Sequence, residues 1–97
     1  MSVEENIPLP AQIVLEQNYP NPFNPTTRIR YELPAPAFVY LAVYSLLGQE
    51  LAVLVQGVER AGHHEIPFDG RALSSGIYLL HLRAGGQIFT RRMVLVR

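Results

Sequence analysis

The stretch from Asn18 to Pro34 limits the possible folds of this chain more than any other feature. Three X-Pro steps exclude a helix in its first half, because proline lacks a backbone N–H and biases the residue before it towards extended conformations. These steps are Tyr19-Pro20, Asn21-Pro22 and Asn24-Pro25. Apolar and charged residues then alternate, with Ile29, Tyr31 and Leu33 on one side and Arg28, Arg30 and Glu32 on the other. This alternation predicts a strand with one buried face, directly after a turn-rich segment.

The asparagines of this segment predict how it is held. Asn18, Asn21 and Asn24 are each expected to hydrogen-bond their own backbone a residue or two further on, which gives a series of Asx-type turns. The Tyr19-Pro20 bond is a candidate for the cis form. Two roles remain open for residues 21–25: a turn that plugs one end of the fold, or a surface that a partner recognises.

The rest of the chain shows short runs with a period of two, separated by turn signals. Strands are expected at residues 13–16, 27–33, 38–44, 64–68, 77–82 and 88–96. Residues 50–56 favour a strand, although their leucines also fall at helical spacing; the flanking Gly48 and Gly57 leave room for about two helical turns, too few for a stable helix. We therefore predict an all-β protein, an immunoglobulin-like antiparallel β-sandwich of about seven strands.

Composition favours a single globular domain. The chain has 97 residues, of which 48% are hydrophobic and 16% charged, which suits one modest core. Residues 11–97 are assigned to this domain, and residues 1–10 to a linker or an added N-terminus. The formal net charge is zero and no run of about 18 apolar residues occurs, so neither nucleic-acid binding nor membrane insertion is expected. The N-terminus lacks a signal-peptide pattern, so the signal of an exported protein would belong to a longer parent.

No catalytic, cofactor or metal site is predicted. The chain has no cysteine, and adjacent His63 and His64 would point to opposite faces of a strand, so they would not grip one metal. His64 and His81 are the pair that neighbouring strands would bring together in a metal site; a partly buried histidine paired to backbone or to a tyrosine is the favoured alternative. Ser74 and Ser75 lie in no nucleophile-elbow pattern, and the acidic residues are scattered.

Two surfaces keep alternative interpretations. Phe38, Tyr40 and Tyr44 form an aromatic stripe on a strand that is apolar on both faces and therefore central. The favoured interpretation covers this stripe with the chain's own first strand and proline-rich segment; contact with a partner or parent domain, and a platform for stacking sugars, remain open. Arg91 and Arg92 lie on the last strand, where charges either protect a sheet edge or form part of a recognised signal.

Several motifs, taken in order, resemble the type A C-terminal sorting domain of proteins exported by the type IX (Por) secretion system. They are Gln17 to Pro34, Val43-Tyr44 with Leu47-Gly48-Gln49-Glu50, Ala61-Gly62 leading to His64 and Phe68-Asp69, Ser75-Gly76-Ile77-Tyr78, and Thr90-Arg91-Arg92-Met93-Val94. The resemblance covers roughly residues 14–97. Part of the strand pattern is also similar to the immunoglobulin-like domain of flagellar hook-capping proteins.

The resemblance implies a non-catalytic address domain at the C-terminus of a larger catalytic or adhesive parent, secreted or held at the surface of a Bacteroidota-like cell. Its partners would be the outer-membrane type IX translocon and a sortase-like protease, with surface attachment in some cases. The residues expected to carry the signal are Asn18, Pro20, Asn21, Pro22, Phe23, Asn24, Pro25, Gly76, Tyr78, Arg91, Arg92 and Met93. The alternatives are a carbohydrate-binding module that uses Phe38, Tyr40 and Tyr44, and an assembly domain of the hook-capping type.

Overall fold

A computed structural model describes residues 8–97, and the expected linker at residues 1–10 lies largely outside this range. Within it the chain forms seven strands and no helix. They are β1 (Val14–Leu15), β2 (Thr26–Leu33), β3 (Ala37–Ser45), β4 (Glu50–Glu59), β5 (Gly62–Asp69), β6 (Gly76–Ala84) and β7 (Gln87–Leu95). The segment at residues 50–56 is therefore a strand, as predicted, and it continues to Glu59. No part of residues 8–97 is a helix long and apolar enough to cross a membrane.

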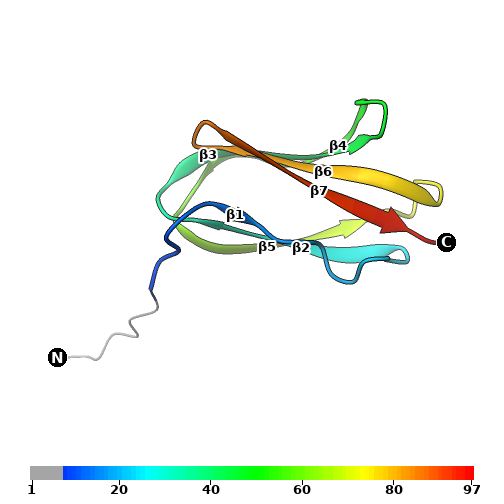
Figure 1. The fold of residues 1–97 in the computed structure, drawn as a ribbon, viewed down its shortest axis with the longest axis horizontal. Coiled ribbons are helices and arrows are strands. Elements are labelled where there is room, and N and C mark those ends of the chain that lie inside the picture. Colours follow the sequence, from blue (N-terminus) through cyan, green and yellow to red (C-terminus); the bar gives the residue numbers. More distant parts are fainter. Residues whose placement is uncertain (1–7) are drawn as a thin grey trace.

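The strands form two antiparallel sheets that pack face to face (Figure 1). One sheet has the order β1-β2-β5 and the other the order β4-β3-β6-β7. The predicted all-β sandwich of about seven strands is confirmed; its immunoglobulin-like character stays a prediction. β3 is a central strand, as its two apolar faces predicted, and β7 is an edge strand.

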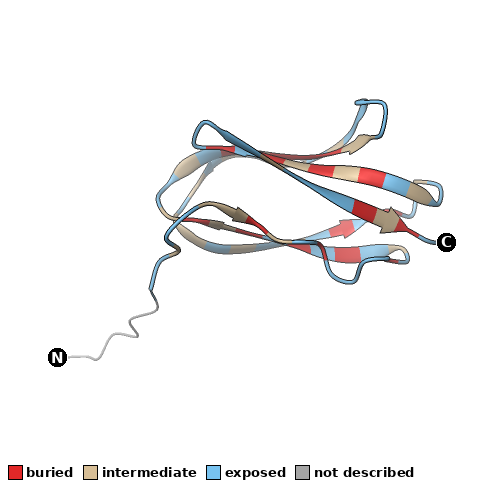
Figure 2. Ribbon diagram, in the orientation of Figure 1, coloured by how far each residue is buried: buried red, intermediate tan, exposed pale blue. Residues whose placement is uncertain are grey.

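The core lies between the sheets, and its buried residues come from every strand except β4, whose Ala52, Leu54 and Val55 are partly buried against it (Figure 2). In β2 the buried residues are Thr27, Ile29, Tyr31 and Leu33, which reproduces the alternation in the sequence. The remaining buried apolar side chains include Val39, Leu41, Val43, Phe68, Leu80, Leu82, Met93 and Leu95. In β2, where inward apolar residues alternate with outward charged ones, a shift of one residue would bury the charges, so the alternation fixes the register.

Two tight turns join the outer hairpins. Gly85 and Gly86 connect β6 to β7 with φ values of 56° and 76°, which L-residues with side chains adopt rarely. Gly48, with φ of 88°, lies in the turn between β3 and β4. Gly76, at the start of β6, has φ of 158°, at the limit of the range that residues with side chains rarely adopt.

The predicted covering of the aromatic stripe is wrong. β1 pairs with β2 in the opposite sheet, and Val39, Leu41 and Val43 are the β3 residues that face the core. Phe38, Tyr40 and Tyr44 therefore lie on the outer face of the four-stranded sheet, where neither β1 nor the proline-rich segment reaches them. β1 instead extends the other sheet at the edge of β2, where Leu15 is fully buried in the core.

Candidate functional site

The Asn-Pro segment, residues 17–25, runs along the seam between the two sheets. Its backbone pairs with β2 at Tyr19, whose N–H and carbonyl bond Arg28 at 3.0 and 2.9 Å. It then pairs with β7 at Phe23, in a parallel bridge to Leu95. All three X-Pro bonds, at Pro20, Pro22 and Pro25, are cis, including the expected Tyr19-Pro20 bond. The segment therefore ties the sheet of β2 to the sheet of β7.

Phe23 fixes the end of the segment in the core. Its side chain is 2% exposed and meets Phe68 edge to face, with ring centroids 6.1 Å apart. Gly70 leaves the space that this ring needs, because a Cβ there would lie 3.2 Å from the Phe23 ring. The Gly70 N–H also donates to the Pro25 carbonyl at 2.8 Å. Phe23 therefore plugs one end of the sandwich, which is one of the two roles that the sequence left open.

Asn18 and Thr27 form a buried polar pair beneath the segment. The Asn18 amide donates to the Thr27 hydroxyl at 3.0 Å and to the Pro20 carbonyl at 3.1 Å. The Thr27 hydroxyl in turn donates to the same Pro20 carbonyl at 2.8 Å, and Gln17 donates to the Asn18 side-chain oxygen at 2.7 Å. Because a buried polar group without a partner costs free energy, this closed set of bonds favours one path for the chain.

Asn21 does not make the local turn expected of it. Its side-chain oxygen accepts from the Val94 N–H at 2.8 Å, and its amide lies 3.4 Å from the Arg92 carbonyl, which also accepts from Gln17 at 2.7 Å. Phe23 continues the pairing, since its N–H donates to the Val94 carbonyl at 2.9 Å and its carbonyl accepts from Val96 at 3.0 Å. The edge of β7 from Arg92 to Val96 is therefore closed by the Asn-Pro segment.

The other predicted members of the segment divide between inside and outside. Asn18 and Phe23 are buried, and Pro25 is half-buried. Pro20, Asn21, Pro22 and Asn24 are exposed, as is Tyr19, with 78% of its surface accessible. The exposed residues of the segment are therefore held in place by the buried Asn18 and Phe23.

The predicted residues of the terminal strand also differ in burial. Met93 is buried in the core, whereas Arg91 and Arg92 are exposed on the edge strand. The Arg91 guanidinium donates to the Leu15 carbonyl at 2.9 Å and so links β7 to β1 in the other sheet. The Arg92 backbone carbonyl, rather than its side chain, holds the Asn-Pro segment.

Gly76 and Tyr78 lie beside the C-terminus, far from Asn18 in the chain. The Tyr78 hydroxyl donates to the Ser74 carbonyl at 2.6 Å. Arg97 donates from its backbone to the Ser75 hydroxyl at 2.8 Å, and its guanidinium donates to the carbonyls of Leu73, at 2.7 Å, and Arg71. The last residue therefore anchors the loop that leads into β6.

The aromatic stripe forms a small polar network on the opposite sheet. Glu50 accepts from the Tyr40 hydroxyl at 2.6 Å and from the Tyr44 hydroxyl at 3.3 Å. The hydrogen bond to Glu50 raises the pKa of Tyr40, and the Arg83 guanidinium lies 5.1 Å from the centre of the Tyr40 ring. Phe38, 55% exposed, completes the stripe. A role for these residues in sugar binding stays a prediction.

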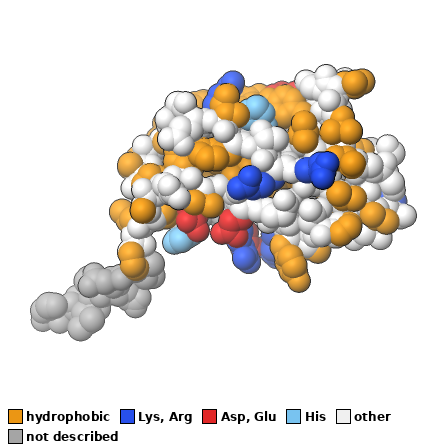
Figure 3. Space-filling view, in the orientation of Figure 1, with side chains coloured by type: hydrophobic (Ala, Val, Ile, Leu, Met, Phe, Trp, Pro, Cys, Tyr) orange, Lys and Arg blue, Asp and Glu red, His pale blue; other side chains and the backbone are white. Residues whose placement is uncertain are grey.

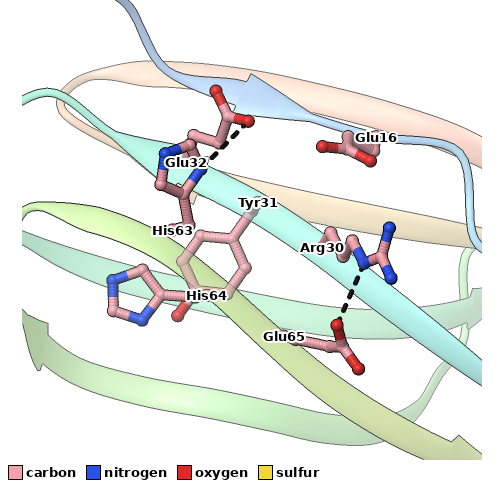
Figure 4. Close-up of a pocket in the computed structure, with 7 residues that line it drawn as sticks. All are labelled: Glu16, Arg30, Tyr31, Glu32, His63, His64 and Glu65. Carbon is pink, nitrogen blue, oxygen red and sulfur yellow. Dashed lines mark hydrogen bonds and ion pairs between the residues drawn. The ribbon is translucent and has the colours of Figure 1, made fainter. Parts of the chain in front are cut away.

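The outer face of the β1-β2-β5 sheet carries paired charges (Figure 4). Glu65 lies 2.6 Å from the Arg28 guanidinium and 3.0 Å from that of Arg30, and these bonds lower the pKa of Glu65. Glu32 lies 3.3 Å from His63. Figure 3 shows acidic, basic and histidine side chains gathered along the edge of the molecule that this sheet forms. This face therefore carries solvent-exposed pairs of acidic and basic side chains.

The histidines follow the favoured interpretation. His64 stacks on Tyr31 with ring centroids 4.8 Å apart, and its Nε2 lies 2.8 Å from the Arg60 carbonyl. Burial raises the pKa of Tyr31 to about 12, with a smaller contribution from the charge of Glu59. His64 and His81 lie in different sheets. Within residues 8–97, no three histidine, aspartate or glutamate side chains converge to hold a metal ion.

Sequence reasoning missed several residues that build this site. Thr27 was counted only as part of an alternating strand, yet its hydroxyl completes the buried pair with Asn18. Gln17 and Arg97 make their bonds across 75 and 24 positions of the chain, a separation at which sequence spacing carries no signal. A threonine at an inward strand position was the one available clue, because a buried hydroxyl needs a partner.

Comparison with known proteins adds to this geometry. The model of the family described as the secretion system C-terminal sorting domain matches residues 17–96. Neither the curated proteins nor the solved structures include a match to the chain. The family match begins at Gln17 and ends at Val96, two residues that the fold brings to the same edge of β7. The chain therefore belongs to the family of type IX secretion C-terminal sorting domains.

Proposed function

We propose that this domain is a non-catalytic sorting signal that directs a larger parent protein through the type IX translocon of the outer membrane. The observation that carries the proposal is the family match, which includes both the Asn-Pro segment and the terminal strand. The fold supports it, because these two distant parts of the sequence form one continuous structure at the edge of β7. The parent would be released into the medium or attached to the cell surface after a sortase-like protease removes the domain.

Recognition of a preformed surface would explain how so small a domain can serve as a binding signal. Segment 17–25 is held by backbone bonds to both sheets and by the buried Asn18–Thr27 pair. A surface that is already ordered loses little conformational entropy on docking, so a modest interface suffices for binding. The signal residues then fall into two groups: Asn18, Phe23 and Met93 build the surface, while the exposed prolines, Asn24 and Arg92 are available to the partner.

The proposal is tested by transferring the address to a reporter. We would fuse residues 1–97 behind a signal peptide and a fluorescent protein in a host that has a type IX system, and measure the fraction of reporter in the medium and on the cell surface. The reporter should leave the periplasm when residues 1–97 are present and accumulate there when Ile88–Arg97 are deleted. The same fusion in a host strain without the translocon is the control. Retention of the intact fusion in the periplasm, or equal export without the translocon, would refute the proposal.

A further inference from the structure

An apolar groove crosses the outer face of the β1-β2-β5 sheet beside the Asn-Pro segment. It is lined by Tyr19 and Pro20 of the Asn-Pro segment, by Pro67 of β5, and by Thr26, Thr27 and Arg28 of β2. Its volume is about 390 Å³, which suits one or two side chains of an extended peptide. Thr27 is buried and its side chain points inwards, whereas the other five residues that line the groove are not part of the buried core.

Tyr19 is the most informative residue of this groove. Its side chain is 78% exposed, although its backbone is fixed by two hydrogen bonds to Arg28. Neither hydrogen bond involves the ring, so the ring itself contributes little to the fold. A large aromatic side chain held at a defined place in solvent, next to two prolines, is a feature typical of interaction surfaces.

Charge at the groove indicates what would occupy it. Arg28 is the charged residue among those that line it, and it shares the single carboxylate of Glu65 with Arg30. Asp69, the β5 neighbour of Thr26, is paired with Arg71 at 2.9 Å, so three guanidinium groups and two carboxylates leave a net charge of +1 at this end of the sheet. Glu16 and Glu32 lie beyond Arg30, around the neighbouring hollow at the other end. An apolar groove bordered by two guanidinium groups that share one carboxylate is complementary to an aromatic or proline side chain that is followed by a carboxylate.

We infer that this groove is the place where the export machinery reads the domain, and that its occupant is an extended segment of the translocon carrying an aromatic or proline side chain next to an acidic one. The inference rests on the proposed function and adds the surface and the chemistry of the partner. Tyr19, Pro20 and Pro67 make the apolar contact, and Arg28 pairs with the acid. The buried residues of the Asn-Pro segment hold Tyr19 in place without touching the partner.

Export of matched variants tests this surface separately from the function. Tyr19→Ala removes the exposed ring and Arg28→Glu reverses the charge; Phe38→Ala and Arg83→Glu make the same changes on the outer face of the other sheet. Each is introduced into the reporter fusion with residues 1–97, and the purified domains are checked by thermal unfolding. We expect both groove variants to lower the export rate by about 30-fold, the loss typical of an interface hot spot, with thermal midpoints close to those of their controls. Glu65→Gln, which frees the guanidinium of Arg28, should export at least as well as the unaltered domain.

The outcomes separate the two claims. Normal export of the folded Tyr19→Ala or Arg28→Glu fusion would overturn the assignment of this groove while the sorting function stands. An equal loss in Phe38→Ala and Arg83→Glu would overturn it as well, since the effect would then not be specific to this sheet. A failure of the unaltered fusion to be exported would instead refute the sorting function, and the assignment with it.

Discussion

Replacement of Phe23 by alanine is the change that most directly tests how the Asn-Pro segment contributes to the fold. The ring is 2% exposed, meets Phe68 edge to face at 6.1 Å and fills the space left by Gly70. Truncating a buried phenylalanine to alanine costs about 3–5 kcal/mol, since it removes apolar burial and leaves a cavity. Domains of this size are stable by about 5–15 kcal/mol, so the loss is a large part of the total.

The expected loss is measurable by thermal and chemical unfolding of the isolated chain. For a domain of about 100 residues, each kcal/mol lowers the melting temperature by roughly 4–8 °C, so Phe23→Ala should lower it by at least about 12 °C. Phe38→Ala is the matched control, because it removes the same atoms from a side chain that is 55% exposed. It should cost less than about 1 kcal/mol, as surface substitutions usually do.

Equal stability of the Phe23→Ala and Phe38→Ala chains would refute the claim that the segment plugs the sandwich. It would mean that residues 17–25 rest on the fold without supporting it. A second variant, Gly70→Ala, probes the same contact from the other side, because its Cβ would lie 3.2 Å from the Phe23 ring and 3.4 Å from the Pro25 carbonyl oxygen. It should also destabilise the chain, by about 1–3 kcal/mol if the ring cannot move away.

Three further predictions follow from the buried polar pair, the core tyrosine and the outer aromatic stripe. Thr27→Val should destabilise the chain by about 1–3 kcal/mol in urea unfolding, because Asn18 loses its buried partner, and Thr26→Val on the exposed side should not. The free energy of unfolding should fall as the pH rises from 10 to about 12, by up to about 1.4 kcal/mol per pH unit. The reason is that the Tyr31 hydroxyl keeps its proton in the folded state at pH values where the unfolded state has lost it. Tyr31→Phe should remove this contribution from the pH dependence of unfolding. If the stripe binds polysaccharide, affinity gels should retard the chain and Tyr40→Ala should abolish the retardation; unchanged migration of the unaltered chain would reject this function.

A variant of this domain can lower export through loss of stability or through loss of recognition, and burial predicts which of the two a given variant tests. Asn18 and Phe23 are buried, so their replacement should impair export through loss of the fold. Tyr19 lies between them in the chain but is exposed, so its replacement tests recognition. We therefore expect export defects at adjacent positions of this motif to have different physical causes, which a measurement of unfolding would tell apart.

Local patterns in the sequence were sufficient to predict the strands and the sandwich. The alternation in β2 and β6 places every second residue on one face, a consequence of backbone geometry that needs no knowledge of the rest of the chain. The glycine pair at the β6–β7 turn was likewise readable, since few other residues adopt its backbone angles. The strand at β4 was the least certain of these, because its leucines also suit a helix; pairing with β3 decided it.

The tertiary structure alone decided what the Asn-Pro segment bonds to and which sheet face the aromatic residues occupy. Asn21 has donors and acceptors that suit a local turn, yet Val94, 73 residues away, provides its partner. Similarly, β3 is apolar on both faces, so its sequence does not tell the inner face from the outer; the choice depends on which strands share its sheet. Period and turn chemistry are properties of neighbouring residues, whereas partners across a sandwich are set by how the whole chain packs.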